Sequence, residues 1–214
     1  MELVITEKVL QGIVNFKRGN YEKHRQLFEE LRDTQKPHTL FITCSDSRID
    51  PNMLTGTLPG ELFIIRNVAN IVPPYRENAE YAATTSAIEY SVQVLGVENI
   101  IVCGHSHCGG CAASLEPEKE MEVLPHTKKW LELIQPVKDR IQQDYPEESQ
   151  QVKTWMMEKM NVVEQLGNLM TYPYIYKRVF AGKLALGGWY YIIGSGEVYI
   201  YDRKTGQFCL GNEC

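Results

Sequence analysis

Three short apolar runs, set among stretches with helical periodicity, limit the fold of this chain more than any other feature. The runs lie at residues 39–43, 61–66 and 99–105, and they are too short for helices but rich in strand-forming residues. Continuous apolar strands that alternate with helices are typical of a parallel sheet flanked by helices. We therefore expect an α/β fold with a mostly parallel central sheet.

Helical periodicity accounts for most of the remaining chain. It covers residues 7–31, with a break near 18–20, and residues 79–95, 127–142 and 149–180, with kinks expected at Pro136 and Pro173. Two further runs, 184–193 and 197–201, flank a Gly-Ser-Gly turn and predict a hairpin that adds an antiparallel edge strand. Because 214 residues without a repeat or linker match one domain of common size, we expect a single domain over residues 1–214.

The composition excludes several classes of protein. The 22 basic and 27 acidic residues give a net charge of −5, which disfavours nucleic acids and anionic membranes because both attract basic surfaces. No apolar run approaches the roughly 18 residues that cross a bilayer, and the first ten residues do not resemble a signal peptide. We therefore expect a cytoplasmic protein. In that reducing compartment, three cysteines between positions 103 and 111 indicate a metal or catalytic site rather than disulfides.

Polar clusters follow the first and third apolar runs, where parallel strands end at the same edge of a sheet. Cys44 follows the first run, His105 ends the third, and Cys108 lies three residues beyond it. Each of these residues alone would be an ordinary buried side chain. Together, two thiolates and one imidazole with a fourth position left over are the pattern of a catalytic zinc site.

Asp46 and Arg48 lie two and four residues after the first candidate ligand. A carboxylate beside Zn²⁺ tends to coordinate the ion and close the site, whereas a planar guanidinium can hold that carboxylate in a bidentate pair. Asp46 would then be free to orient a water molecule on the metal. The alternative is a solvated surface ion pair of little energetic weight.

Three competing motifs are weaker. Cys103, Cys108 and Cys111 have the spacing of some [2Fe–2S] ferredoxins, but Cys103 lies within an apolar run and Cys44 is left unexplained. The segment from Gly104 to Cys108 partly matches a nucleophile elbow, but its fifth residue is not glycine. The segment between Cys44 and Arg48 is too short to encircle a phosphate.

The two clusters, Cys44-Ser-Asp-Ser-Arg48 and Gly104-His-Ser-His-Cys-Gly-Gly110, resemble the signature motifs of β-class carbonic anhydrases. Further segments fit this family over most of the chain: Pro59-Gly-Glu61, Arg66-Asn-Val-Ala-Asn70, Ala87-Ile-Glu-Tyr90, Gly167-Asn-Leu and Tyr172-Pro173. The resemblance implies one zinc ion per chain, held by Cys44, His105 and Cys108, with water in the fourth place or Asp46 there in a closed state. It also implies that Asp46 and Arg48 form a catalytic dyad and that N-terminal helices embrace a partner in a homodimer, which could pair into a tetramer.

The same resemblance assigns a substrate pocket. Its candidate residues are Gln35, Phe63, Val68, Tyr90 and Gly109. A regulated subgroup of the family carries tryptophan three residues before the first ligand cysteine, together with an arginine and a tyrosine that match Arg66 and Tyr191. Here the tryptophan position is Phe41, so the resemblance favours the plant-like subgroup.

The expected reaction is the reversible hydration of carbon dioxide to bicarbonate and a proton, through attack of a zinc-bound hydroxide on CO₂. Two alternatives remain open at this point. One is a zinc hydrolase of the same fold that acts on CS₂, and the other is a module without enzymatic activity that binds metal or bicarbonate. No residue of the sequence stands out as the proton shuttle.

Overall fold

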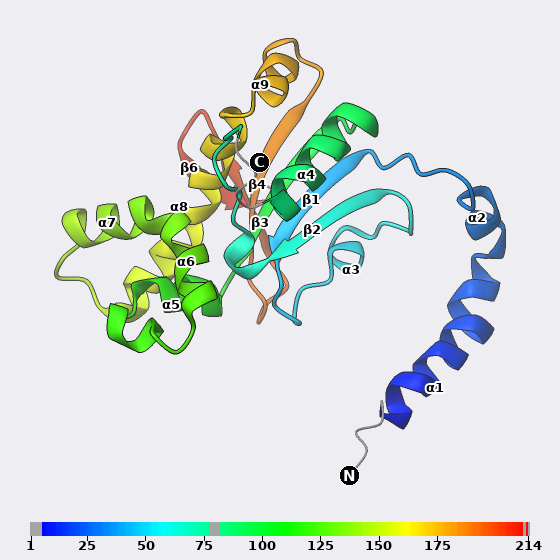
Figure 1. Cartoon of the computed structure of the whole chain (residues 1–214), viewed down its shortest axis with the longest axis horizontal. Coiled ribbons are helices and arrows are strands. Elements are labelled where there is room, and N and C mark those ends of the chain that lie inside the picture. The colour runs from blue at the N-terminus through cyan, green and yellow to red at the C-terminus, as the bar shows by residue number, and fades with distance from the viewer. Residues whose placement is uncertain (1–5, 78–81, 212, 214) are drawn as a thin grey trace. The chain divides into compact units, whose positions relative to one another are not determined.

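The structure is a computed structural model that describes residues 6–77, 82–211 and 213. The chain divides into two compact units, Met1–Lys36 and Pro37–Cys214, and each is described by itself. Figure 1 shows the course of the chain and labels its elements. None of the helices within the described residues is long and apolar enough to span a membrane.

The first unit is helical, as expected. It consists of α1 (Glu7–Phe16), the π-helical turn η1 (Lys17–Tyr21) and α2 (Arg25–Glu30). The predicted break near residues 18–20 is wrong, because Gly19 lies within η1 and the helices separate at His24 instead. A glycine within a helix costs only about 1 kcal/mol, so it weakens a helix without ending it. No residue of α1 is buried. Five large apolar side chains of this helix are therefore exposed: Val9, Leu10, Ile13, Val14 and Phe16.

The second unit is built on one six-stranded sheet with the order β2-β1-β3-β4-β5-β6. Its strands are β1 (Thr39–Cys44), β2 (Leu62–Asn67), β3 (Asn99–His105), β4 (Ala185–Tyr191), β5 (Val198–Asp202) and β6 (Gln207–Leu210). The first four strands are mutually parallel, and β5 and β6 pair antiparallel at one edge. The mostly parallel sheet and the hairpin are therefore confirmed. The four residues of β6 were not predicted.

Helices flank this sheet. They are α3 (Pro51–Thr55), η2 (Val68–Asn70), α4 (Ala82–Glu89), η3 (Tyr90–Val94), α5 (Gly109–Leu115), η4 (Glu118–Met121), α6 (Pro125–Leu131), η5 (Glu132–Ile134), α7 (Gln135–Asp144), α8 (Gln150–Met170) and α9 (Pro173–Phe180). The predicted kinks are wrong, because Pro136 and Pro173 lie in the first turns of α7 and α9. Proline has no backbone N–H, and the N–H groups in the first turn of a helix have no partner within the helix. Proline is therefore favoured at the start of a helix. Residues 79–81 of the predicted helix 79–95 fall outside the described residues.

Helix α8 contributes to both hydrophobic clusters of this unit. Val162, Leu166 and Leu169 pack in a cluster with apolar residues of β1, β2 and β3. Met157, five residues before Val162, belongs to a second cluster with residues of α5, α6 and α7, and this cluster also contains Cys44 and Cys108. Figure 1 shows these green helices gathered beside the yellow α8. The site described below therefore lies where α8 joins the sheet to the smaller helices.

Gly104 marks the closest approach of α8 to the sheet. A Cβ atom at Gly104 would lie 2.7 Å from Val162 Cγ2 and 3.3 Å from the carbonyl oxygen of Glu158. We expect Gly104→Ala to lower the free energy of unfolding by about 1–3 kcal/mol, because an added methyl group overpacks this contact. Urea denaturation monitored by circular dichroism measures the change.

Gly167→Ala is the matched control for this substitution. Gly167 lies in α8, and a methyl group added there would meet no atom within 4 Å, so alanine should raise helix stability by roughly 0.5–1 kcal/mol. Equal losses in both variants would contradict the close packing at Gly104.

Candidate metal centre and active site

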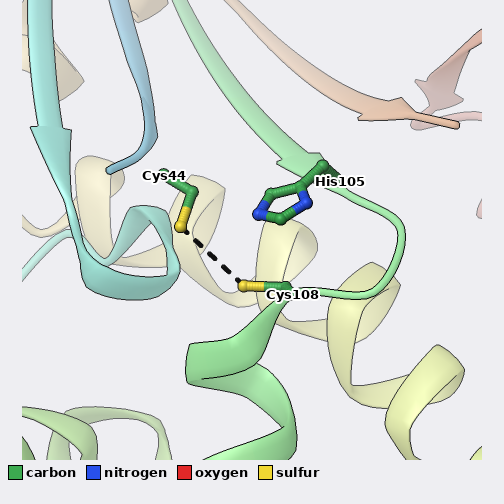
Figure 2. A group of neighbouring side chains, drawn as sticks. All are labelled: Cys44, His105 and Cys108. Atoms are coloured by element: carbon green, nitrogen blue, oxygen red, sulfur yellow. Dashed lines mark hydrogen bonds between the residues drawn. The ribbon is translucent and has the colours of Figure 1, made fainter. Parts of the chain in front are cut away.

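Three predicted ligands converge at the carboxyl ends of neighbouring strands. Cys44 is the last residue of β1, His105 is the last residue of β3, and Cys108 immediately precedes α5. One donor atom from each lies within 4.8 Å of the other two, and the two sulfur atoms are 3.9 Å apart. Figure 2 shows the two thiols and the imidazole facing a common point. All three side chains are buried, so the cluster is of the right size and composition for one metal ion.

The hydrogen bonding of the His105 imidazole is that of a metal ligand. Its Nδ1 atom lies 2.9 Å from the carbonyl oxygen of Ser106, to which an Nδ1–H can donate a hydrogen bond. Its Nε2 atom is buried and has no hydrogen-bond partner within the described part of the chain. A buried polar atom without a partner is costly, and metal-binding histidines characteristically donate their other nitrogen to an acceptor of this kind. The buried Nε2 atom and the two thiols therefore fit a metal ion.

The two thiols resist ionisation in the absence of a cation. Hydrogen bonding with Cys108, followed by burial, raises the pKa of Cys44 to about 12. The pKa of Cys108 is also raised, chiefly by its hydrogen bond with Cys111 and also by burial. A divalent cation reverses this preference, because it stabilises adjacent thiolates directly.

The dyad predicted from the sequence is formed. Arg48 donates from Nε to Asp46 Oδ1 at 2.9 Å and from Nη2 to Asp46 Oδ2 at 2.7 Å, and its backbone N–H also donates to Oδ1 at 2.9 Å. The guanidinium beside it holds the pKa of Asp46 well below its usual range. Asp46 Oδ2 lies 3.9 Å from His105 Nε2, so the carboxylate borders the metal cluster without leaving Arg48.

Two arginines fix the loop that carries this dyad. Arg48 also donates to the carbonyl oxygen of His107 at 3.0 Å, which joins the loop after β1 to the loop after β3. Arg66 donates to the carbonyl oxygens of Cys44 at 3.1 Å and of Asp46 at 2.5 Å. In this structure Arg66 therefore supports the backbone of the ligand loop.

The predicted substrate residues fall into separate groups. Val68 packs on α5, since a Cβ at Gly110 would lie 2.7 Å from Val68 Cγ1, and Gly109 is the first residue of the same helix. Phe63 and Tyr90 form an aromatic pair with ring centroids 6.0 Å apart.

The aromatic pair stands away from the metal cluster within one chain. Phe63 is four residues before Asn67, which is the register partner of Cys44, so it lies about 13 Å back along the strand. Gln35 belongs to the first unit. The second unit alone therefore places Val68 and Gly109 near the metal cluster but not Phe63 and Tyr90.

Arg48 also borders a cavity of about 750 Å³. Its walls come from the loop after β3, the first turns of α8 and the end of β4, and include His107, Trp155, Glu158 and Ile192. None of the predicted substrate residues lines it. It is therefore distinct from the predicted substrate pocket.

Polar residues of α8 were missed by the sequence analysis. Four of them are buried and recur at helical spacing on one face: Glu158, Asn161, Gln165 and Asn168. Asn161 donates to the carbonyl oxygen of Ala69 at 2.8 Å, and Gln165 accepts the N–H of Val72 at 2.8 Å. They hold the segment around η2, in which Ala69 and Asn70 adopt left-handed conformations that are uncommon outside glycine. Their spacing of three and four residues could have indicated a buried polar face. The sequence analysis did not distinguish it from the apolar residues between them.

Comparison with known proteins agrees with this geometry. A model of the carbonic anhydrase family matches residues 39–198. A carbonic anhydrase of Helicobacter pylori strain J99 is 39% identical over 201 residues, which cover 92% of this chain and 90% of that protein.

Solved structures give the same result. The β-carbonic anhydrase CcaA has a TM-score of 0.91 at 38% identity and covers 95% of this chain and 91% of its own. One of two tetrameric β-carbonic anhydrases from Sordaria macrospora has a TM-score of 0.80 at 28% identity, covering 90% of this chain and 94% of its own.

A parallel sheet with a Cys-His-Cys cluster at its carboxyl edge defines a metalloenzyme of the α/β class, and the matches specify which one. The chain belongs to the carbonic anhydrase family, in its β class. It is an enzyme that catalyses the reversible hydration of carbon dioxide with zinc as its cofactor. The relatives do not favour action on CS₂ or a role without catalysis.

Proposed function

We propose that Cys44, His105 and Cys108 bind the catalytic zinc ion and that Asp46 and Arg48 form the catalytic dyad. The observation that carries this proposal is the buried Nε2 atom of His105, which has no partner in the described chain and faces two thiols and the Asp46 carboxylate. We also propose that residues 1–214 act as one domain, although the chain divides into two compact units.

The dyad provides an acceptor beside the metal position. Zinc supplies Lewis acidity there, which lowers the pKa of a water molecule toward neutrality. Asp46 remains a carboxylate at working pH because Arg48 holds its pKa low, so Oδ2 accepts a hydrogen bond and orients the nucleophilic oxygen toward CO₂. Arg48 occupies both carboxylate oxygens, and this keeps Asp46 from closing on the ion.

The substrate pocket is proposed to form between two chains. Val68 and Gly109 would come from the chain that holds the ion, and Phe63, Tyr90 and Gln35 from its partner. The distance of the aromatic pair from the cluster in its own chain supports this assignment, as does the unburied apolar face of α1, which could cover a partner. A homodimer is the minimal assembly, and a tetramer is compatible with the tetrameric Sordaria macrospora relatives. A cytoplasmic location and the plant-like subgroup stay predictions.

Stopped-flow CO₂ hydration, followed with a pH indicator at about pH 8.5 on zinc-loaded protein, tests the proposed site. We expect rapid hydration in the wild type and loss of both zinc and activity in Cys108→Ser, because a hydroxyl is a much poorer ligand for zinc than a thiolate. Cys103→Ser is the matched control, since this buried cysteine lies outside the three-residue cluster and its thiol donates to the carbonyl oxygen of Gly104 rather than contacting a proposed ligand. Retention of zinc and activity in Cys108→Ser would refute the proposed ligand set.

A further inference from the structure

A buried acid lies directly behind the proposed metal centre. Glu158 on α8 is only 3% exposed. Its Oε1 atom accepts the backbone N–H of Cys108 at 2.9 Å, and its Oε2 atom accepts the hydroxyl of Tyr190 at 2.5 Å. Tyr190 is itself 1% exposed, and burial followed by the adjacent Glu158 raises the pKa of its hydroxyl, which keeps the hydroxyl a proton donor.

Such an acid is expensive to bury. Removing a carboxylate from water costs several kcal/mol, and replacing buried ionic groups by apolar residues is often neutral or stabilising. Val162 occupies the position one helical turn later in α8 and packs in the hydrophobic core. Fold stability alone therefore does not account for Glu158, and its contact with Cys108 suggests a role at the metal centre.

The start of α5 explains what this contact does. Cys108 is the N-cap residue of α5, a position where a side chain commonly folds back to accept a backbone N–H of its own helix. The Cys108 side chain makes no such bond. In a capping box, a glutamate three residues into the helix accepts the N–H of the N-cap residue. Here Glu158 accepts that N–H from a different helix.

Glu158 lies on α8, a helix that packs firmly against the site. The backbone of α8 at Glu158 packs against Gly104, the residue before the ligand His105. One turn later, Asn161 donates to the segment around η2. Because α8 is fixed against both sides of the site, the Glu158 carboxyl group can set the position of the Cys108 backbone.

We propose that Glu158 is a positioning residue for the metal centre: its carboxyl group, anchored by Tyr190, holds the Cys108 backbone so that the thiol points to the ion. This inference rests on the proposed zinc ligands. Groups that support metal ligands from behind typically contribute 10–100-fold to metal affinity. Glu158 acts through Cys108 and touches neither metal nor substrate.

Zinc affinity, measured by competition with a chromophoric chelator, tests the proposal with two substitutions at one position. We expect Glu158→Leu, which has a similar volume but no acceptor, to bind zinc 10–100-fold more weakly than the wild type. Glu158→Gln should stay within about threefold of the wild type, because its amide oxygen can accept the Cys108 N–H while its NH₂ group faces the Tyr190 oxygen. Equal affinity in Glu158→Leu and the wild type would overturn the proposal, as would an equal loss in both variants.

The absorption spectrum of the cobalt-substituted protein gives a second readout. The spectrum reports the ligands and geometry around the ion, which a general loss of stability does not alter. We expect it to change in Glu158→Leu and to be restored in Glu158→Gln. Gln165→Leu is the structural control, since Gln165 is equally buried on α8 but supports Val72 rather than a ligand. Its spectrum and zinc affinity should match the wild type, and equal changes in Gln165→Leu would reduce Glu158 to a structural role.

The two proposals can fail separately. If the wild type binds no zinc, or if zinc binding survives Cys108→Ser, the proposed ligand set is refuted. If the wild type binds one zinc per chain through Cys108 but Glu158→Leu binds it equally well, only the positioning role is refuted. Circular dichroism confirms that each variant is folded before its affinity is compared.

Discussion

His105→Ala is expected to lower bound zinc from one ion per chain to a small residual fraction and to abolish CO₂ hydration. The substitution removes the imidazole whose Nε2 atom has no other partner in the described chain, and it leaves two thiols 3.9 Å apart. Two ligands hold zinc far less tightly than three. Because the ion supplies several kcal/mol of catalysis, the activity should fall at least about a thousandfold. Atomic emission for zinc and stopped-flow hydration measure the two effects on one sample.

His107→Asn is the control for this variant. His107 lies two residues further along, is exposed and stands outside the metal cluster. Its φ of 55° is left-handed, and asparagine tolerates that conformation better than alanine does. The backbone carbonyl that accepts from Arg48 is unchanged by the substitution. Loss of zinc in His107→Asn, or its retention in His105→Ala, would show that the imidazole ligand has been misassigned.

Arg48→Ala is expected to separate metal binding from activity. The variant should keep one zinc per chain, because Arg48 donates to Asp46 and His107 but to no ligand atom. Its activity should fall about a hundredfold, a loss that misplacing a catalytic group by an ångström can cause. The physical cause is Asp46, which is released beside the cluster and can take the fourth position on the ion.

Cobalt substitution distinguishes this cause from a general disturbance. The spectrum of Arg48→Ala should change as a carboxylate joins the ion, and Asp46→Asn combined with Arg48→Ala should restore it because an amide is a poorer ligand. Arg140→Ala removes an ion pair of similar length, 2.9 Å to Glu164, between partly exposed side chains outside the site. That variant should keep full activity. Wild-type activity in Arg48→Ala would refute the proposal that Arg48 keeps Asp46 from closing on the ion.

The fold followed from local patterns wherever those patterns were long or strongly apolar. The runs that became β1, β2 and β3 were correct to within one residue at each end, because each is a short run of apolar, strand-forming residues. The edge strand β6 was missed, since Gln207–Leu210 spans only four residues and begins with a polar one. The prolines of α7 and α9 were misinterpreted because the same residue that breaks a helix interior is favoured in its first turn.

The metal cluster could be predicted because its members follow strands that end at one edge of the sheet. Glu158 could not be predicted in the same way. Its partners, Cys108 and Tyr190, are 50 and 32 residues away in the chain, and only the packed helix brings them together. The proposed assignment of Phe63 and Tyr90 to a partner's pocket illustrates a different limit, because a pattern within one chain cannot specify which copy of the chain a residue serves.

The polar face of α8 bears on how the protein acquires its metal. In small zinc domains the ion supplies the free energy of folding, so removing it unfolds the chain. Here the segment around η2 is fastened by hydrogen bonds from Asn161, Gln165 and Asn168 that involve no ligand atom. Folding should therefore precede metallation. The finished site would then select among cellular ions by its donor atoms, and its two thiols favour zinc over magnesium or manganese.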